Sequence, residues 1–272
     1  MVRPAFLDFV TGLVRIIAAR PRVARPLAGN PVLAAVLGRR SVRAFRSREL
    51  QPDVWEAILE AGRLAPSTVN LQTWSFVEFT ADTWRTTFGR PLPFGAARAV
   101  MVLADVHRAR RAVEGFPYSP LCEYTVGVMN ASLAAMAMTI AGEGLGVASV
   151  MLSETGRTGF YDAGDLAGRL ELPPGVVPIM SIAFGYPRHA PPPMPPRLPR
   201  TAVAFPPPYR ETEQDVLDAW MQQMQAGYSA SNPGRRFRSQ ILHYNRRIGQ
   251  AERDLRRLVF YAGEPHDERE ES

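Results

Sequence analysis

Residues 39–45 read Arg-Arg-Ser-Val-Arg-Ala-Phe, and residues 65–74 read Ala-Pro-Ser-Thr-Val-Asn-Leu-Gln-Thr-Trp. The first segment places three guanidinium groups and a hydroxyl at a predicted helix end. Because the planar donor fork of Arg matches phosphate oxygens, Arg39, Arg40 and Arg43 are candidates to surround one phosphate, and Ser41 can add a hydroxyl bond. A solvated basic helix end explains the same residues equally well, since cations favour the C-terminal end of the helix dipole.

The second segment forms a polar turn after a helix. One face of residues 54–64 is apolar, which predicts an amphipathic helix that Pro66 ends. Ser67, Asn70 and Gln72 then combine donors and acceptors, which suits the uracil-like edge of a flavin. A turn by itself explains Pro-Ser-Thr just as well.

Together the two segments resemble the nitroreductase family of FMN-dependent oxidoreductases, whose motifs read R-R-S-x-R-x-F and, after a helix, A-P-S-S-x-N-x-Q-P-W. The chain departs at Thr68, where the family has a second Ser, and at Thr73, where it has Pro. Residues 130–146 resemble the family's long central helix ending in G-L-G, and residues 176–187 resemble its late strand ending in G-Y-P. The resemblance covers roughly residues 31–203.

This resemblance implies an FMN site and assigns residues to it. The phosphate and ribityl groups are assigned to Arg39, Arg40, Ser41, Arg43 and Arg197. The ring system is assigned to Pro66, Ser67, Asn70 and Gln72, and the backbone near flavin N5 and O4 to Leu152 and Ser153, where the family often has Gly. Arg197 lies in an arm with ten prolines, residues 187–208, which predicts extended chain, and Arg200 is the alternative. No catalytic side chain is expected, because the flavin carries the chemistry.

The resemblance also implies an activity. Hydride passes from NADH or NADPH to FMN, and then to a nitroaromatic, quinone or similar small organic acceptor in ping-pong order. One alternative is a specialised member that fragments reduced flavin, dehalogenates aromatics or oxidises azoline rings. Another is a non-enzymatic interaction protein with a basic tail. A cytoplasmic homodimer with FMN between the subunits is expected.

Composition excludes several other mechanisms. All 32 basic residues are Arg, so a Schiff-base or P-loop lysine is absent, and the net charge of +6 suits anionic cofactors. Cys122 is the only cysteine, which leaves no intrachain disulfide or thiolate cluster, and we expect it to be buried packing. The four histidines are scattered without metal-ligand spacing, so no metal site is expected.

The pattern of the central region predicts an α+β fold, a mixed or antiparallel sheet flanked by helices, as the resemblance also implies. Helices are expected over residues 31–38, 52–64, 119–143 and 164–170, and strands over 75–80, 98–106, 147–152 and 177–185. A stripe on the long helix, Val126, Met129, Leu133, Met136 and Ile140, is interpreted as core, with alanines elsewhere for close packing. In the family this helix lies at the dimer interface.

Helical extensions flank the FMN-binding domain (31–203) at residues 1–30 and 204–272. Residues 6–19 predict an amphipathic helix docked on the protein or its partner subunit, although Arg20, Arg22 and Arg25 leave a membrane-surface role open. Helices are expected over 211–224 and 237–261, with a break at 227–234 and an apolar seam on the second helix that needs a partner surface. The many arginines of this tail are interpreted as a solvated face, so no nucleic acid is expected. No segment is expected to span a bilayer.

Overall fold

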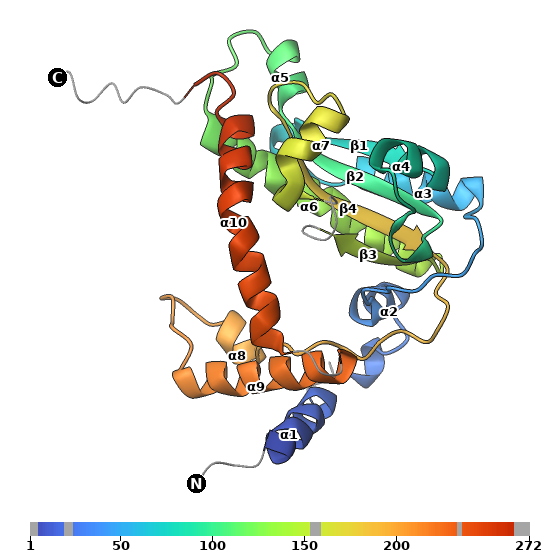
Figure 1. Cartoon of the computed structure of the whole chain (residues 1–272), viewed down its shortest axis with the longest axis vertical. Helices are drawn as coiled ribbons and strands as arrows, with labels where there is room; N and C mark the ends of the chain where they lie inside the picture. Colours follow the sequence, from blue (N-terminus) through green and yellow to red (C-terminus); the bar gives the residue numbers. More distant parts are fainter. Residues whose placement is uncertain (1–4, 19–23, 153–158, 233–235, 264–272) are drawn as a thin grey trace, which may run out of the picture. The chain divides into compact units, whose positions relative to one another are not determined.

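The computed structural model describes residues 5–18, 24–152, 159–232 and 236–263, and its centre is a four-stranded sheet with helices on both faces (Figure 1). The strands lie in the order β1 (Trp74–Phe79), β2 (Arg98–Asp105), β4 (Val176–Gly185), β3 (Ala148–Leu152). Every neighbouring pair is antiparallel. The expected α+β fold class is confirmed, and each strand begins and ends within a residue or two of its expected position.

The chain divides into two compact units. The sheet unit comprises residues 29–192 and 247–272, and the helical unit comprises residues 1–28 and 193–246. The boundary between them near the C-terminus falls within the long helix α10 (Phe237–Val259). The predicted phosphate and ring-binding segments both belong to the sheet unit.

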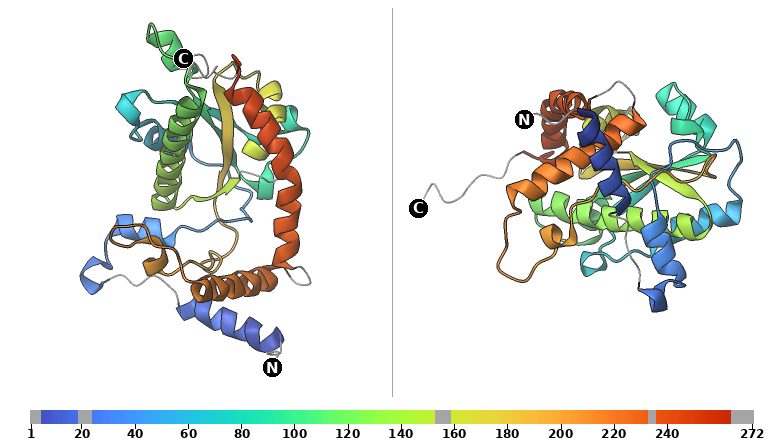
Figure 2. Two further views of the ribbon diagram at one scale, coloured as in Figure 1. Left: turned by 90° about the vertical axis from the view of Figure 1, so that its left-hand side faces the viewer. Right: turned by 90° about the horizontal axis from the view of Figure 1, so that it is seen from below.

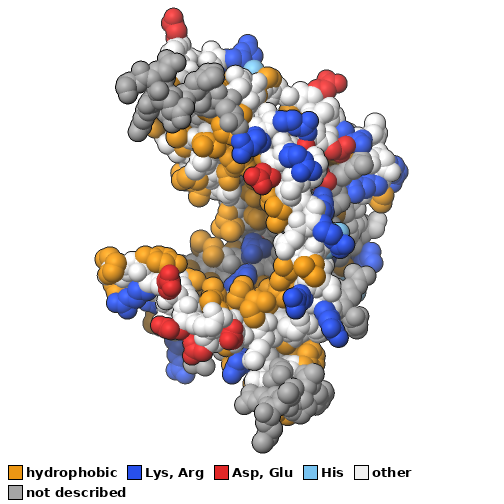
Figure 3. All heavy atoms as spheres, turned by 60° about the vertical axis from the view of Figure 1, so that its left-hand side comes forward, with side chains coloured by type: hydrophobic (Ala, Val, Ile, Leu, Met, Phe, Trp, Pro, Cys, Tyr) orange, Lys and Arg blue, Asp and Glu red, His pale blue; other side chains and the backbone are white. Residues whose placement is uncertain are grey.

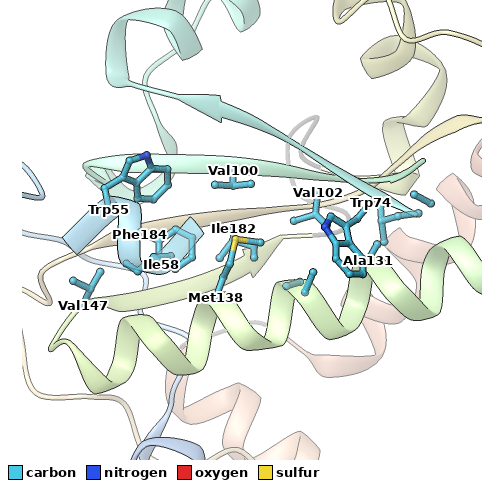
Figure 4. Close-up of a cluster of buried hydrophobic side chains, with 14 of the residues drawn as sticks. Trp55, Ile58, Trp74, Val100, Val102, Ala131, Met138, Val147, Ile182 and Phe184 are labelled. Carbon is cyan, nitrogen blue, oxygen red and sulfur yellow. The ribbon is translucent and has the colours of Figure 1, made fainter. Parts of the chain in front are cut away.

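Two layers of helices bury the sheet on both faces. Helices α3 (Pro52–Arg63) and α6 (Pro120–Gly144) cover one face, and α4 (Ala81–Phe88) and α7 (Ala163–Arg169) cover the other. Strand β2 alternates accordingly: Val100 and Val102 face α6, whereas Met101 and Leu103 join the opposite cluster. Figure 4 shows Ile58 of α3 and Met138 of α6 within the first cluster. Burial on both faces explains why β2 is apolar between its two charged ends, from Ala99 to Ala104.

Helix α6 turns its alanines, and not its methionine stripe, toward the sheet. Ala131, Ala134 and Ala135 are fully buried. In contrast, the expectation that the stripe is core is wrong for Met129, Leu133 and Met136, which are 55%, 47% and 43% exposed, whereas Val126 and Ile140 are half-buried. Small side chains let the helix axis approach the sheet closely, which leaves the longer ones outside.

Cys122 is also exposed, contrary to expectation. Hydrophobic side chains lie exposed on the side of the sheet unit drawn in Figure 3.

Helix α6 bears on the expectation that no segment spans a bilayer, because it is long and apolar enough to do so. By length and composition this helix passes that test, and no other helix among the described residues does. However, 44% of its apolar window is buried inside the fold, on the alanine-rich face that packs on the sheet. A core helix of this kind meets the same criterion as a membrane span.

In the helical unit, α1 (Ala5–Ala18) packs on α9 (Gln214–Ser231), as both views of Figure 2 show. A Cβ added to Gly12 would stand only 2.5 Å from Cβ of Ala226, so the helices meet closely there. Docking of α1 on the protein is thereby confirmed. The expected break near Gly227 is wrong, because α9 continues through this residue to Ser231. A Cβ added to Gly227 would stand 3.4 Å from Cδ1 of Ile16 and 3.5 Å from Cδ of Pro196.

The remaining helices are short. They are α2 (Pro31–Gly38), α5 (His107–Ala112), α8 (Arg200–Val203) and the 3-10 turns Arg25–Leu27, Thr68–Asn70, Pro93–Gly95 and Phe160–Asp162. Helix α8 interrupts the proline-rich arm, which was expected to be extended throughout. Within the sheet unit, Ala251 is buried, and Leu255 and Leu258 pack on the sheet core, so this half of the seam finds a partner surface.

Candidate functional site

The arginine segment is anchored beside the edge strand β3 by two buried apolar side chains. Val42 and Phe45 are 7% and 1% exposed. The Val42 N–H donates to the Ser149 carbonyl at 3.1 Å, and Ser41 pairs with Ser149 in a parallel bridge. Arg43 lies exposed between the two anchors, and Arg39 is half-buried. The two buried anchors therefore hold the backbone of this segment beside β3, and the arginines between and before them remain available to a ligand.

Arg40 is partly committed to the end of α2. Its Nη1 donates to the carbonyl oxygens of Leu37, Gly38 and Arg39, at 2.8, 3.1 and 2.8 Å. These carbonyls have no partner inside the helix, so the guanidinium caps them and matches the negative end of the helix dipole. The interpretation of these arginines as a basic helix end therefore holds for Arg40. Its other donors remain available for a further role.

Glu143, at the end of α6, is a carboxylate beside the arginines that the sequence analysis did not single out. It lines a cavity of about 160 Å³ together with Arg40, Val42 and Ala148. Burial raises the pKa of the Glu143 carboxyl, and the charges of Arg39 and Arg40 act in the opposite direction. In the sequence, the only sign that Glu143 lies near the site was its position one residue before the G-L-G ending of the long helix. An anion bound by these arginines would meet the field of Glu143.

The loop of residues 65–74 is held in a strained conformation that presents two amides. Val69, Asn70 and Gln72 have φ angles of 51°, 56° and 50°, a region that L-residues rarely adopt. The Ser67 hydroxyl accepts from the Gln72 N–H at 3.0 Å and closes the loop. Asn70, Gln72 and Pro66 are exposed, and Ser67 is half-buried. Gln72 also lines a cavity of about 500 Å³ with Trp74 and Arg108.

Asn130 of α6 connects the two positions at which the loop departs from the family motif. Its Oδ1 accepts from the Thr68 N–H at 3.2 Å and from the Thr68 hydroxyl at 3.3 Å, and its Nδ2 donates to Thr73 Oγ1 at 2.8 Å. Thr73 and Asn130 are 2% and 1% exposed. The two threonines therefore fasten the loop to the core helix through one buried amide, a role that sequence reasoning missed.

Replacing Asn130 with Leu should cost about 2–4 kcal/mol of unfolding free energy, because the buried Thr73 hydroxyl and the part-buried Thr68 N–H both lose their partner. Urea denaturation measures the loss, and hydrogen exchange should show faster exchange over residues 67–73. Thr139→Val on the same helix is the control. Its buried hydroxyl donates within the helix, to the Met136 carbonyl at 2.9 Å and to the Met136 sulfur at 3.5 Å, so its loss should cost less. Equal costs for both variants would contradict the fastening role.

Three further residues were assigned to the FMN site: Leu152, Ser153 and Arg197. Leu152 is buried at the end of β3, Ser153 lies outside the described residues, and Arg197 belongs to the helical unit. The roles of all three stay predictions. The loop contacts α6 at Asn130, whereas the arginines face Glu143, thirteen residues further along, which is roughly 20 Å of helix. Within one sheet unit the phosphate and ring clusters are therefore well separated.

A third, apolar pocket of about 280 Å³ lies elsewhere in the sheet unit, between α6, the turn at Phe160 and α10. Tyr124, Phe160, Leu255 and Phe260 are among its lining residues. Burial raises the pKa of the Tyr124 hydroxyl. Its aromatic lining resembles that of small-molecule pockets in general, where flat apolar ligands bind.

Known proteins resemble this chain in sequence and in fold. A model of the Nitroreductase family matches residues 36–85. An Archaeoglobus fulgidus protein, provisionally named NADH dehydrogenase/NAD(P)H nitroreductase, is 30% identical over 162 residues, which span 57% of this chain and 85% of the relative. The FMN reductase (NAD(P)H) of Bacillus subtilis is 27% identical over 208 residues, 71% of this chain and 79% of the relative.

Solved structures share the arrangement of the elements. Nitroreductase A from Vibrio parahaemolyticus superimposes with a TM-score of 0.69 at 22% identity, covering 84% of this chain and 98% of that chain. At this level of identity the likeness shows the fold alone.

Proposed function

This chain belongs to the nitroreductase family of flavin-dependent oxidoreductases, and on that premise we propose that it passes hydride from NADH or NADPH through FMN to a small organic acceptor. Nitroaromatics and quinones are the acceptors we propose, in ping-pong order and in the cytoplasm. The observation that carries the proposal is the pair of anchored segments. Both family motifs are present, and each is held by its own buried contacts.

The chemistry of the side chains fits FMN. Arg39 and Arg43 offer planar donor forks for a phosphate dianion, beside the rigid backbone of residues 41–45. Asn70 and Gln72 offer exposed amides that match the alternating donors and acceptors of the flavin's polar edge. When bound, FMN supplies the redox chemistry between the reduced nicotinamide and the acceptor. The chain itself orients the cofactor and compensates its charge.

A homodimer accounts for the separation of the two clusters. We propose that the ring residues of one chain complete the phosphate site of the other, across an interface formed by α6. The exposed stripe of Met129, Leu133 and Met136 supports this, since apolar rows on a helix are usually covered. Leu133→Glu should shift the protein from dimer to monomer in sedimentation equilibrium and release FMN. The control Leu145→Glu changes a residue of similar exposure just beyond the helix, and it should stay dimeric.

An absorption spectrum of the purified protein tests the function directly. Flavin bands that bleach on anaerobic addition of NADPH or NADH, and return on addition of a quinone or nitroaromatic, are the expected result. The faster donor identifies the nicotinamide preference. A colourless protein that does not bind added FMN would contradict the proposal.

Glu143→Gln should tighten FMN binding by about two- to fivefold near neutral pH, because an anion facing Arg39 and Arg40 opposes the phosphate. Fluorescence titration with FMN measures the change. Riboflavin lacks the phosphate and should bind both proteins alike. Since burial raises the pKa of Glu143, its protonation begins at a higher pH than that of an exposed Glu, and the difference between the proteins should shrink as the pH falls. A difference that is also seen with riboflavin would argue against a phosphate effect.

A further inference from the structure

Helix α1 is apolar on two opposite sides. One side packs on α9 through Gly12 and Ile16, which are buried. The other side carries a row of exposed side chains, here called the outer stripe: Leu7 (51%), Val10 (40%), Val14 (60%) and Ile17 (61%). Their spacing of three and four residues places them on one face. The contact with α9 therefore covers only one of the two apolar sides of this helix.

A surface helix normally turns a polar face outward. In α1 the polar side chains between the two apolar sides are few: Thr11 and Arg15 are among them. A contiguous apolar row of this kind marks an interaction site. The charge of the N-terminal segment itself is strongly one-sided, since the first thirty residues contain five arginines and a single acid, Asp8. Arg15 and Arg25 are exposed, and one Arg15 nitrogen, Nη1, donates to Oε1 of Gln222 on α9 at 3.5 Å.

We propose that the outer stripe binds the surface of an anionic lipid bilayer, with the helix lying in the interface and the arginines on the headgroups. Apolar side chains supply burial at the acyl boundary, and each basic residue near an anionic surface adds attraction. A second copy of the chain fits less well, because a symmetric contact would bring two copies of residues 1–30 together, and the only acid of that basic segment is Asp8. The proposal is independent of the flavin function, and it adds a membrane-surface location to it.

Vesicle sedimentation with the full-length protein tests the proposal. Wild type should pellet with vesicles of phosphatidylcholine and phosphatidylglycerol, far less with phosphatidylcholine alone, and added salt should weaken the binding. Val14→Ser combined with Ile17→Ser should lower the partition coefficient by about tenfold or more, because two apolar side chains no longer enter the interface. Both positions face away from α9, so circular dichroism and Tm should be unchanged.

The matched control is Met221→Ser combined with Leu242→Ser, which removes two exposed apolar side chains from other helices of the helical unit. It should bind like wild type. Wild type that remains in the supernatant with anionic vesicles overturns the proposal, as does equal binding by the stripe variant. A stripe variant that changes the mass of the protein in sedimentation equilibrium would assign the stripe to a second copy instead, and this also overturns it. Flavin content is read from the same samples, so failure of the FMN proposal is seen separately.

Discussion

Removing the guanidinium groups of Arg39 and Arg43 together is expected to weaken FMN binding by about a hundredfold or more, because each charge-assisted bond to a phosphate contributes about 1.5–3 kcal/mol. Stability should change little, since Arg43 is exposed and the anchors of the segment are Val42 and Phe45. Fluorescence titration of the Arg39→Ala, Arg43→Ala double variant measures the affinity, and thermal unfolding measures the stability.

Two comparisons make this result specific to the phosphate. Riboflavin should bind the double variant and the wild type alike, because it lacks the phosphate. Arg85→Ala removes a positive charge from an exposed position on α4, outside the predicted site, and should leave FMN binding nearly unchanged. If Arg85→Ala weakened FMN as much as the site variants did, the effect would be one of net charge. Arg40 is better tested alone, since its loss also uncaps α2.

Phe45→Ala is expected to cost about 3–5 kcal/mol of unfolding free energy, the usual range for a large aromatic side chain removed from a packed core. Phe45 is 1% exposed and anchors the end of the arginine segment beside β4. Because the same anchor positions the guanidinium groups, FMN affinity should fall in the folded fraction as well. Urea denaturation gives the first quantity, and FMN titration below the unfolding transition gives the second. Phe94→Ala is the control, since its side chain is 38% exposed.

Gly185 of β4 tests the packing against Phe45 from the opposite side. A Cβ at this position would stand 2.9 Å from Cδ1 of Phe45, so Gly185→Ala should cost about 1–3 kcal/mol through overpacking. In the Phe45→Ala background most of the ring is gone, and the same change should cost less, with a coupling of about 1 kcal/mol. Strict additivity of the two losses would show that the ring does not press on Gly185.

Local chemistry accounts for the parts of the fold that were predictable. Pro at the first position and an apolar face gave the bounds of α2 and, to within a residue, of α3. Runs of apolar residues predicted the strands β2 and β4. The same local reasoning failed at Gly227, because α9 packs on α1 there and tertiary packing outweighs the low helix propensity of Gly.

The candidate site divides in the same way. The arginines and the amide loop could be predicted as site residues, because their side-chain types and spacing determine which donors and acceptors they offer. Glu143 and Asn130 were not, because each acquires its role by meeting a segment far away in the chain. A lone Glu or Asn in a helix carries no local sign of such a partner.

By itself, therefore, the sequence determined the family, the element types and the residues suited to a flavin phosphate, all of which depend on short-range pattern. The tertiary structure alone decided which face of α6 is buried, since methionine and alanine stripes are both apolar and only packing density selects the smaller one. It likewise decided that α1 docks by one side and leaves a second apolar side outward, because periodicity shows that a face is apolar but not what covers it.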